Sequence, residues 1–153
     1  MNNQHTTQTL NYYNQNAAQF SDSTQSLDFA SVQDKFLSFL QPQAHILDFG
    51  CGPGRDTKYF LSHGCSTDAI DGSEEFCRIA SEYAGIPVKQ MLFQEMNASE
   101  EYDGIWACSS ILHSTYDDLK DILKKLARAL KKEGILYASF KYGDFEGMRN
   151  GRY

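Results

Sequence analysis

The sequence predicts one α/β domain of the doubly wound class, built on a mainly parallel sheet of five strands. Three observations lead to this class. Short apolar segments that suit buried strands alternate with segments whose apolar residues recur at helical spacing. A glycine-rich loop follows the first buried segment, and an acidic residue ends the second, as at the carboxyl edge of such a sheet. At 153 residues the chain is long enough to bury an ordinary core in one domain.

Two segments come before the first predicted strand. The first ten residues are polar, rich in Asn, Gln and Thr, and are expected to fray. Between residues 27 and 40, apolar side chains such as Phe29 and Phe36 fall on one helical face, which predicts a helix. Pro42 ends this helix, because proline cannot continue one.

The remaining strands and helices are predicted in strict alternation. The predicted strands cover residues 44–49, 65–70, 88–92, 102–107 and 135–140. The predicted helices between them cover residues 56–63, 73–83 and 117–131. Gly64 is expected to stop the first of these helices, and Ser73 to cap the second. Ser114 and Asp117 are the expected capping box of the third, which Gly134 separates from the last strand. Helical connections of this kind join parallel strands through right-handed crossovers.

The composition and its patterns argue against several classes of function. A net charge of −6 disfavours a nucleic-acid partner, because that surface needs clustered positive charge. No apolar stretch is long enough to cross a bilayer, and the N-terminus lacks a secretion-signal pattern. The four cysteines show no C-x-x-C pairing, so we expect reduced thiols in a cytoplasmic protein. The four histidines are scattered without ligand spacing, and no metal site is expected.

The stretch "ILDFGCGPGRDT", residues 46–57, raises the question of which ligand it binds. The fingerprint for nicotinamide dinucleotides is G-x-G-x-x-G, in which the third glycine packs the helix against the strand. Here Gly50, Gly52 and Gly54 form G-x-G-x-G, and Arg55 stands where that third glycine belongs. A long arginine cannot make the close contact, so the spacing disfavours a diphosphate-bearing ligand.

Two acidic residues accompany this loop. Asp71 ends the second predicted strand about twenty residues further on, where a ribose-binding acid belongs. Its carboxylate can accept hydrogen bonds from both hydroxyls of a ribose. Asp48 comes directly before the loop and is expected near an ammonium group or a bound water. The strand, the loop, the helix and Asp71 together favour a ligand site over a purely structural turn.

These residues resemble the class I S-adenosylmethionine-dependent methyltransferases that act on small molecules. The stretch "ILDFGCGPGRDT" is similar to their first motif and "AIDGSEEF" to their acidic second motif. The later stretches "MLFQEM" and "YDGIWACSSILHS" are similar to their third and fourth segments, and "YYNQNAAQFSDST" resembles a leading helix that covers the cofactor. The resemblance implies a Rossmann-like fold, S-adenosylmethionine as cofactor, S-adenosylhomocysteine as product and a small-molecule methyl acceptor.

The resemblance also implies a cofactor site, assigned by position in the motifs. The loop glycines and Asp48 would face the methionine part, and Asp71 would bind the ribose. Leu92 and Phe93 would flank the adenine, with Gln94 in place of the acid that is common in the family. The implied set is Tyr13, Asp48, Gly50, Cys51, Gly52, Gly54, Asp71, Gly72, Ser73, Leu92, Phe93, Gln94, Ala107 and Cys108.

The catalytic residues stay open. Methyl transfer from a sulfonium depends mainly on positioning and desolvation, and it needs a base only if the nucleophile carries a proton. His113 is the candidate base, although packing or capping is the favoured interpretation of this residue. Tyr12 and Tyr13 could close over the methionine carboxylate, with core packing an equal alternative. Cys51 and Cys108 are expected to pack and not to react.

Three functions follow, in order of preference. The first is a methyltransferase that acts on a small molecule, and the second is a cofactor-binding module without activity. The third and weakest is a nicotinamide-dependent oxidoreductase, which the glycine spacing disfavours. The expected division is an N-terminal segment that covers the cofactor (1–25), a binding domain (26–142) and a C-terminal tail (143–153).

The last predicted strand, residues 135–140, is expected to have an open edge. The family's sheet has seven strands, the last two forming an antiparallel hairpin beside the fifth. No such hairpin is predicted in this chain, and glycines weaken any strand in the tail. An open apolar edge pairs readily with another chain. We therefore expect a homodimer through this edge or the tail.

Overall fold

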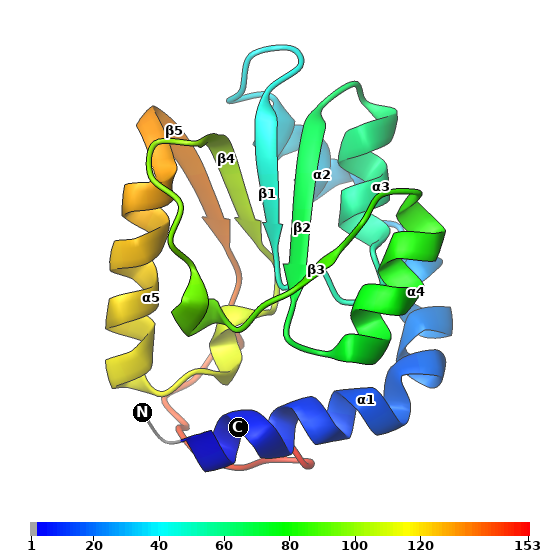
Figure 1. Ribbon diagram of the computed structural model, residues 1–153, viewed down its shortest axis with the longest axis vertical. Helices are drawn as coiled ribbons and strands as arrows, with labels where there is room; N and C mark the ends of the chain where they lie inside the picture. The colour runs from blue at the N-terminus through cyan, green and yellow to red at the C-terminus, as the bar shows by residue number, and fades with distance from the viewer. Residues whose placement is uncertain (1–2) are drawn as a thin grey trace.

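The computed structural model describes residues 3–153 and confirms the predicted fold class (Figure 1). Its sheet has five strands, all parallel, in the order β3-β2-β1-β4-β5. The strands are β1 (His45–Phe49), β2 (Ser66–Asp71), β3 (Lys89–Gln90), β4 (Tyr102–Ala107) and β5 (Leu130–Ala138). The helices are α1 (Asn3–Gln25), α2 (Ala30–Leu37), α3 (Arg55–Ser62), α4 (Glu74–Ala84) and α5 (Tyr116–Ala129), with 3-10 turns η1 (Phe93–Glu95) and η2 (Ile111–His113).

Alternating side chains along the central strands build a core on each face of the sheet. Leu47 and Ile105 point to one face, where Ile122 and Leu126 of α5 pack on them. Their neighbours in sequence point to the other face, because successive side chains of a strand alternate. There Ile46 and Trp106 pack with Phe36 of α2 and Phe60 of α3. Helices therefore cover both faces, as a doubly wound domain requires.

The helix caps agree with the sequence in one case and differ in another. The Ser73 hydroxyl accepts a hydrogen bond from the Phe76 amide at the start of α4, which confirms Ser73 as N-cap. The capping box of Ser114 and Asp117 is wrong. Thr115 is the N-cap of α5, and its hydroxyl accepts from the Asp118 amide at 3.2 Å while it donates to the Asp118 carboxylate.

Two strands differ from their predicted extent. The predicted strand at 88–92 shrinks to Lys89–Gln90, because only these two residues pair with β2 before the chain turns into η1. The predicted strand at 135–140 instead begins at Leu130, which pairs with Tyr102. The register then shifts, and regular pairing resumes where Ile135 meets Gly104. The helix predicted to reach residue 131 correspondingly ends at Ala129.

The N-terminal segment is ordered where fraying was expected. Residues 3–10 form the first turns of α1, while residues 1–2 lie outside the described part. The helix holds because Thr9 and Ala17 are buried against the rest of the chain. In Figure 1, α1 crosses the end of the domain at which the strands finish. Its position makes it a wall of the region next to the carboxyl ends of the strands.

The C-terminal segment lies beside α1 and not along β5 (Figure 1). The Tyr153 amide donates to the Thr9 hydroxyl at 3.1 Å, and Arg152 lies over the rings of Tyr12 and Tyr13. β5 pairs with β4, and no other strand within residues 3–153 pairs with it. The predicted open edge is therefore present in the described chain. None of the helices in that range has the length and apolar character of a membrane span.

Candidate cofactor-binding site

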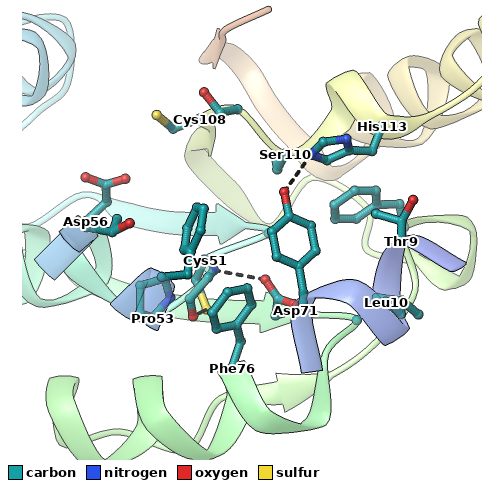
Figure 2. Close-up of a pocket in the computed structure, with 18 of the residues that line it drawn as sticks. Thr9, Leu10, Cys51, Pro53, Asp56, Asp71, Phe76, Cys108, Ser110 and His113 are labelled. Carbon is teal, nitrogen blue, oxygen red and sulfur yellow. Dashed lines mark hydrogen bonds between the residues drawn. The ribbon is translucent and has the colours of Figure 1, made fainter. Parts of the chain in front are cut away.

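A cavity of about 470 Å³ opens at the carboxyl ends of β1, β2 and β4 (Figure 2). The loop after β1, the end of β2, the segment before η1 and the segment after β4 form its floor and sides. Residues of α1 form the opposing wall. The cavity therefore lies where ligands bind in open parallel sheets, outside the carboxyl ends of the strands.

Most of the implied cofactor residues line this cavity. Those that do are Tyr13, Gly50, Cys51, Gly52, Asp71, Gly72, Leu92, Phe93, Gln94 and Cys108. Those that do not are Asp48, Gly54, Ser73 and Ala107. The residues of the second group are all buried behind the residues that line the cavity.

The loop after β1 is held to β2 by backbone hydrogen bonds. The amides of Gly50 and Cys51 both donate to the Ile70 carbonyl at 3.0 Å. Gly50 has φ of +81°, and a Cβ on it would lie 2.4 Å from the Ser110 Cβ. A Cβ on Gly52 would meet no atom within 4 Å. At Gly50 the backbone of the loop therefore packs closely against Ser110, in the segment after β4. At Gly52 the loop leaves open space.

Gly54 replaces the missing third glycine of the nicotinamide fingerprint as the point of close packing. A Cβ on Gly54 would lie 3.1 Å from both the Cα and the Cβ of Ala80, so this glycine lets α3 approach α4. The close approach is therefore between two helices and begins one residue before Arg55. Arg55 itself is free to extend into the cavity wall.

Asp71 links the end of β2 to the glycine loop. Its Oδ2 accepts from the Gly52 amide at 2.9 Å, and its Oδ1 accepts from the Ser73 amide at 2.8 Å. Burial raises the pKa of Asp71 to about 6, although the backbone hydrogen bonds oppose this shift. Figure 2 shows Asp71 among the residues that line the cavity, with its carboxylate directed toward the glycine loop. The carboxylate is thus a positioned acceptor with a pKa close to neutral pH.

Asp48 lies behind the wall and not in the cavity, contrary to what the resemblance implies. It is 1% exposed, and the Thr57 hydroxyl donates to its Oδ2 at 2.6 Å. Burial raises its pKa well above the ordinary value, and the nearby Asp56 carboxylate adds to the shift. Its side chain joins β1 to α3, because alternation along β1 turns it to the face that α3 covers.

The implied adenine region has an apolar wall and one amide side chain. The Phe93 ring stacks on Phe49 with ring centroids 4.4 Å apart. The Leu92 amide is not free for a ligand, because it donates to the Glu95 carboxylate at 2.7 Å. The side chains of Leu92 and Gln94 line the cavity. The expected replacement of the family's acid by Gln94 stays a prediction.

A directed chain of hydrogen bonds joins α1 to His113 and to the C-terminal segment. Arg152 Nη1 donates to the Tyr13 hydroxyl at 3.2 Å, since a guanidinium has only donors. The Tyr13 hydroxyl donates a hydrogen bond to His113 Nε2, 2.7 Å away, because Nδ1 carries the proton of the neutral ring. The protonated Nδ1 of His113 then donates to the Tyr153 carbonyl at 2.6 Å. Burial lowers the pKa of His113, so the neutral tautomer required by this chain is favoured.

Sequence reasoning missed a second polar group at the other end of the cavity. Arg55 and Asp56 both line it, and they pair through Nε and Nη2 at 2.9 and 3.1 Å. The Asp56 carboxylate also accepts from Gln33 Nε2 at 2.6 Å and from Trp106 Nε1 at 2.9 Å. The Arg55 guanidinium lies over the Phe29 ring. The adjacent "RD" after the glycines was a signal for this pair, but its buried donors come from distant elements.

The thiols and other potential ligands show no metal-binding arrangement. Across residues 3–153, no group of three or more His, Cys, Asp or Glu is placed to hold a metal ion. Cys51 and Cys108 line the cavity and are free thiols. Burial raises the pKa of both thiols, which keeps them protonated and poorly nucleophilic.

Comparisons with known proteins agree with this geometry. The methyltransferase domain family matches residues 46–134. The malonyl-[acyl-carrier protein] O-methyltransferase of Enterobacter lignolyticus is 29% identical in an alignment of 99 residues, and the match covers 61% of this chain and 37% of that protein. The nicotinamide-dependent alternative finds no support in these similarities.

Two solved structures share the fold. A Galdieria sulphuraria protein assigned as a sarcosine dimethylglycine methyltransferase has TM-score 0.62 and 26% identity, over 70% of this chain and 45% of that one. The Burkholderia thailandensis 1,6-didemethyltoxoflavin N1-methyltransferase has TM-score 0.57 and 24% identity, over 66% and 46% of the two chains. This chain thus spans less than half the length of each relative named. Because the family match covers more than half of this chain and the fold agrees with it, the chain belongs to the methyltransferase domain family of class I fold.

Proposed function

We propose that the chain binds S-adenosylmethionine in the cavity above β1 and β2 and transfers its methyl group to a small molecule. The observation that carries this proposal is the Asp71 carboxylate, which faces the cavity while it holds the glycine loop through Gly52. Family membership supports the proposal, as does the Burkholderia thailandensis enzyme, which was solved with S-adenosylhomocysteine bound. The chain spans 37% of the Enterobacter relative, so the activity is a proposal for the chain as given.

The residues present fit this cofactor. Asp71 accepts backbone hydrogen bonds from Gly52, Gly72 and Ser73, and a carboxylate has about four lone-pair sites, so a ribose hydroxyl can use another. Gly52 leaves open space for the part of the ligand that crosses the loop. The rings and aliphatic groups of Phe93 and Leu92 offer an apolar wall to an adenine. Tyr13 on α1 would close the site from the opposite side.

The chemistry and the protein's part in it are separate. When bound, S-adenosylmethionine would supply a methyl group whose bond to sulfur breaks as the acceptor bonds to the methyl carbon, which leaves S-adenosylhomocysteine. The protein's residues hold the donor, orient the acceptor and exclude water, which can supply much of the rate in such a displacement. Tyr13 and Leu10 of α1 would cover one side of the bound donor and limit its contact with water. His113 would accept a proton only after Tyr13 moved, because the Tyr13 hydroxyl occupies Nε2.

A ligand comparison tests the proposal. A ligand that binds only the native state raises the melting temperature by mass action. We expect S-adenosylhomocysteine in excess to raise it, and an equal concentration of NAD to leave it unchanged. A shift with NAD and none with S-adenosylhomocysteine would contradict the proposal. An assay for methyl transfer to candidate acceptors then separates an active enzyme from a cofactor-binding module without activity.

The division into segments 1–25, 26–142 and 143–153, and the cytoplasmic location, stay predictions.

A further inference from the structure

A second cavity, of about 300 Å³, lies beside the cofactor cavity. His113 and Ser114 belong to the walls of both cavities. The other walls come from the start of α5 and from the C-terminal segment after β5. The two spaces therefore meet at this short stretch after β4, and a ligand in the second cavity would lie next to the region proposed for the cofactor.

The charged side chains of the second cavity are mostly cationic. Lys141, Arg149 and Arg152 line it, against a single carboxylate side chain, Glu146. That carboxylate is already engaged, because Glu146 Oε1 accepts from the Tyr116 amide at 3.0 Å and from the Tyr153 hydroxyl at 2.9 Å. Within the described residues, none of the three cations forms an ion pair. The three cationic side chains thus outnumber the one carboxylate side chain at this cavity and form no ion pair with it.

One donor of the Arg152 guanidinium also lacks a partner. Arg152 Nε is buried and makes no hydrogen bond with the described chain, although Nη1 of the same side chain reaches Tyr13. A buried N–H of a charged group without a partner is costly, which favours an acceptor that would satisfy it. Burial, together with the charges of Arg152 and Lys141, also lowers the pKa of His113. The charges of Arg152 and Lys141 therefore affect His113, which lines both cavities.

The remaining lining favours a flat ligand. Aromatic side chains surround the space, and Tyr116, Phe140 and Phe145 are each more than half exposed. Exposed aromatic rings gain from stacking on another ring, and arginine stacks on such rings as well. A planar group with a negative charge would match both the rings and the unpaired cations.

We propose, resting on the proposed methyltransferase function, that the second cavity binds the methyl acceptor and that this acceptor is an aromatic carboxylate. Its carboxylate would pair with Arg149 and Arg152, and its ring would lie among Tyr116, Phe140 and Phe145. The group to be methylated would then point past His113 and Ser114 into the cofactor cavity, because transfer requires direct contact with the methyl group. Because binding depends on this charged carboxylate, we expect the second cavity to discriminate against the neutral amide of the same ring.

Benzoate and benzamide test this assignment, because they differ in charge and hardly in shape. The protein saturated with S-adenosylhomocysteine is titrated with each compound, and the amide chemical shifts of the 15N-labelled chain are followed. We expect benzoate to bind with a dissociation constant on the order of millimolar, as suits so small a ligand, with shifts centred on residues 113–116 and 140–153. Benzamide is expected to bind at least about tenfold more weakly.

Two variants with the same change of charge complete the test. Arg149→Gln is expected to weaken benzoate about fivefold or more, the scale of losing a charged hydrogen bond, with no change in S-adenosylhomocysteine affinity. Lys124→Gln removes a cation that is exposed on α5 and pairs with Asp121, and it is expected to change neither affinity.

Several outcomes would overturn the inference. These are equal binding of benzoate and benzamide, benzoate shifts centred on the cofactor cavity, displacement of S-adenosylhomocysteine by benzoate, or equal loss in the two variants. Absence of benzoate binding, with S-adenosylhomocysteine still bound, overturns the inference and leaves the proposed function intact. Failure of S-adenosylhomocysteine itself to bind removes the proposed function, and the inference with it.

Discussion

Gly50 and Gly64 have the same left-handed backbone, with φ of +81° at both, but their surroundings differ. A Cβ at Gly64 would meet no atom within 4 Å, whereas one at Gly50 would overlap Ser110. Gly64→Ala should therefore cost only the conformational penalty, about 1–2 kcal/mol. Gly50→Ala should cost roughly 1–3 kcal/mol more, because the overlap forces the loop or Ser110 to shift.

Urea unfolding of the two alanine variants measures this difference. The same samples should show that Gly50→Ala weakens S-adenosylhomocysteine binding, while Gly64→Ala leaves it unchanged. Equal losses of stability would mean that the loop has room to move away from Ser110.

The ionisation of Asp71 makes folding stability and cofactor affinity depend on pH in opposite directions. Its pKa is raised from 3.8 to about 6, so the folded state holds this proton more tightly than the unfolded state. Its contribution to folding stability is therefore fully present below pH 3.8 and is lost as the pH rises through 6. Cofactor affinity should change in the other direction, because an ionised carboxylate accepts the ribose hydroxyls more strongly.

Calorimetric titration with S-adenosylhomocysteine between pH 5 and pH 7.5 tests the binding half of this prediction. We expect the affinity to rise about fivefold or more across that range. Asp71→Asn cannot ionise, and its affinity should be lower and nearly constant with pH. A wild-type affinity that is flat, or that falls with rising pH, would show that this carboxylate does not bind the ribose.

At the scale of elements, the Tyr13 hydroxyl links α1 to two other parts of the chain, in addition to the buried contacts of Thr9 and Ala17. Tyr13 receives a hydrogen bond from Arg152 and donates one to His113, while no described residue bonds to the Tyr12 hydroxyl. Tyr13→Phe should therefore loosen α1, with each lost hydrogen bond contributing about 1 kcal/mol. Tyr12→Phe keeps an aromatic ring under Arg152 and should leave α1 in place.

Hydrogen exchange of the α1 amides distinguishes the two substitutions, because it reports local opening. We expect exchange to accelerate about fivefold or more in Tyr13→Phe. In Tyr12→Phe it should stay at the wild-type rate. Equal rates in both variants would mean that apolar packing, and not the hydrogen bonds, holds the helix.

The sequence predicted well those elements whose own residues show that they are buried. β4 was expected at 102–107 and lies at Tyr102–Ala107, because a buried apolar run fixed it from within. β3 is shorter than expected because its length depends on pairing with the end of β2, which the residues of β3 do not encode. The first turns of α1 carry polar residues that suggested fraying. They are held by contacts with Tyr153, which sequence distance hides.

The site shows the same division between local and distant signals. The glycine loop and Asp71 lie in two motifs and were expected together, and they meet through the Gly52 amide. Asp48 was expected to face the ligand, but strand alternation turns its side chain toward Thr57. The Arg152, Tyr13 and His113 chain joins three regions of the sequence. No motif spans such a set, so only the folded structure brings it together.

For the whole molecule, the open edge of β5 leads us to propose a homodimer. Leu136 on β5 and Leu123 on α5 are each 37% exposed, and Phe140 beyond the strand is 51% exposed. An unpaired edge next to apolar side chains favours pairing with a second copy. Leu136→Lys should therefore disrupt the dimer, while Leu123→Lys, an equally exposed site on a helix, should not.

Light scattering over a range of protein concentrations measures the mass directly. We expect twice the chain mass for the wild type and for Leu123→Lys, and the single-chain mass for Leu136→Lys. A wild type that stays monomeric at high micromolar concentration would rule out the edge as an interface. A dimer that Leu136→Lys leaves intact would direct attention to the C-terminal segment.

Trp106 is the single tryptophan of the chain, it is fully buried, and its indole nitrogen donates to the Asp56 carboxylate at the cavity wall. Its ring also stacks on Tyr137, with centroids 4.0 Å apart. The chain therefore carries an intrinsic fluorophore one hydrogen bond away from the space where we propose that catalysis occurs. We expect a blue-shifted emission that changes in intensity when a ligand perturbs Arg55 or Asp56. Unlabelled protein in a stopped-flow instrument should then report the rate at which the methyl donor binds. Emission that stays constant while calorimetry shows binding would mean that the donor does not reach this end of the cavity.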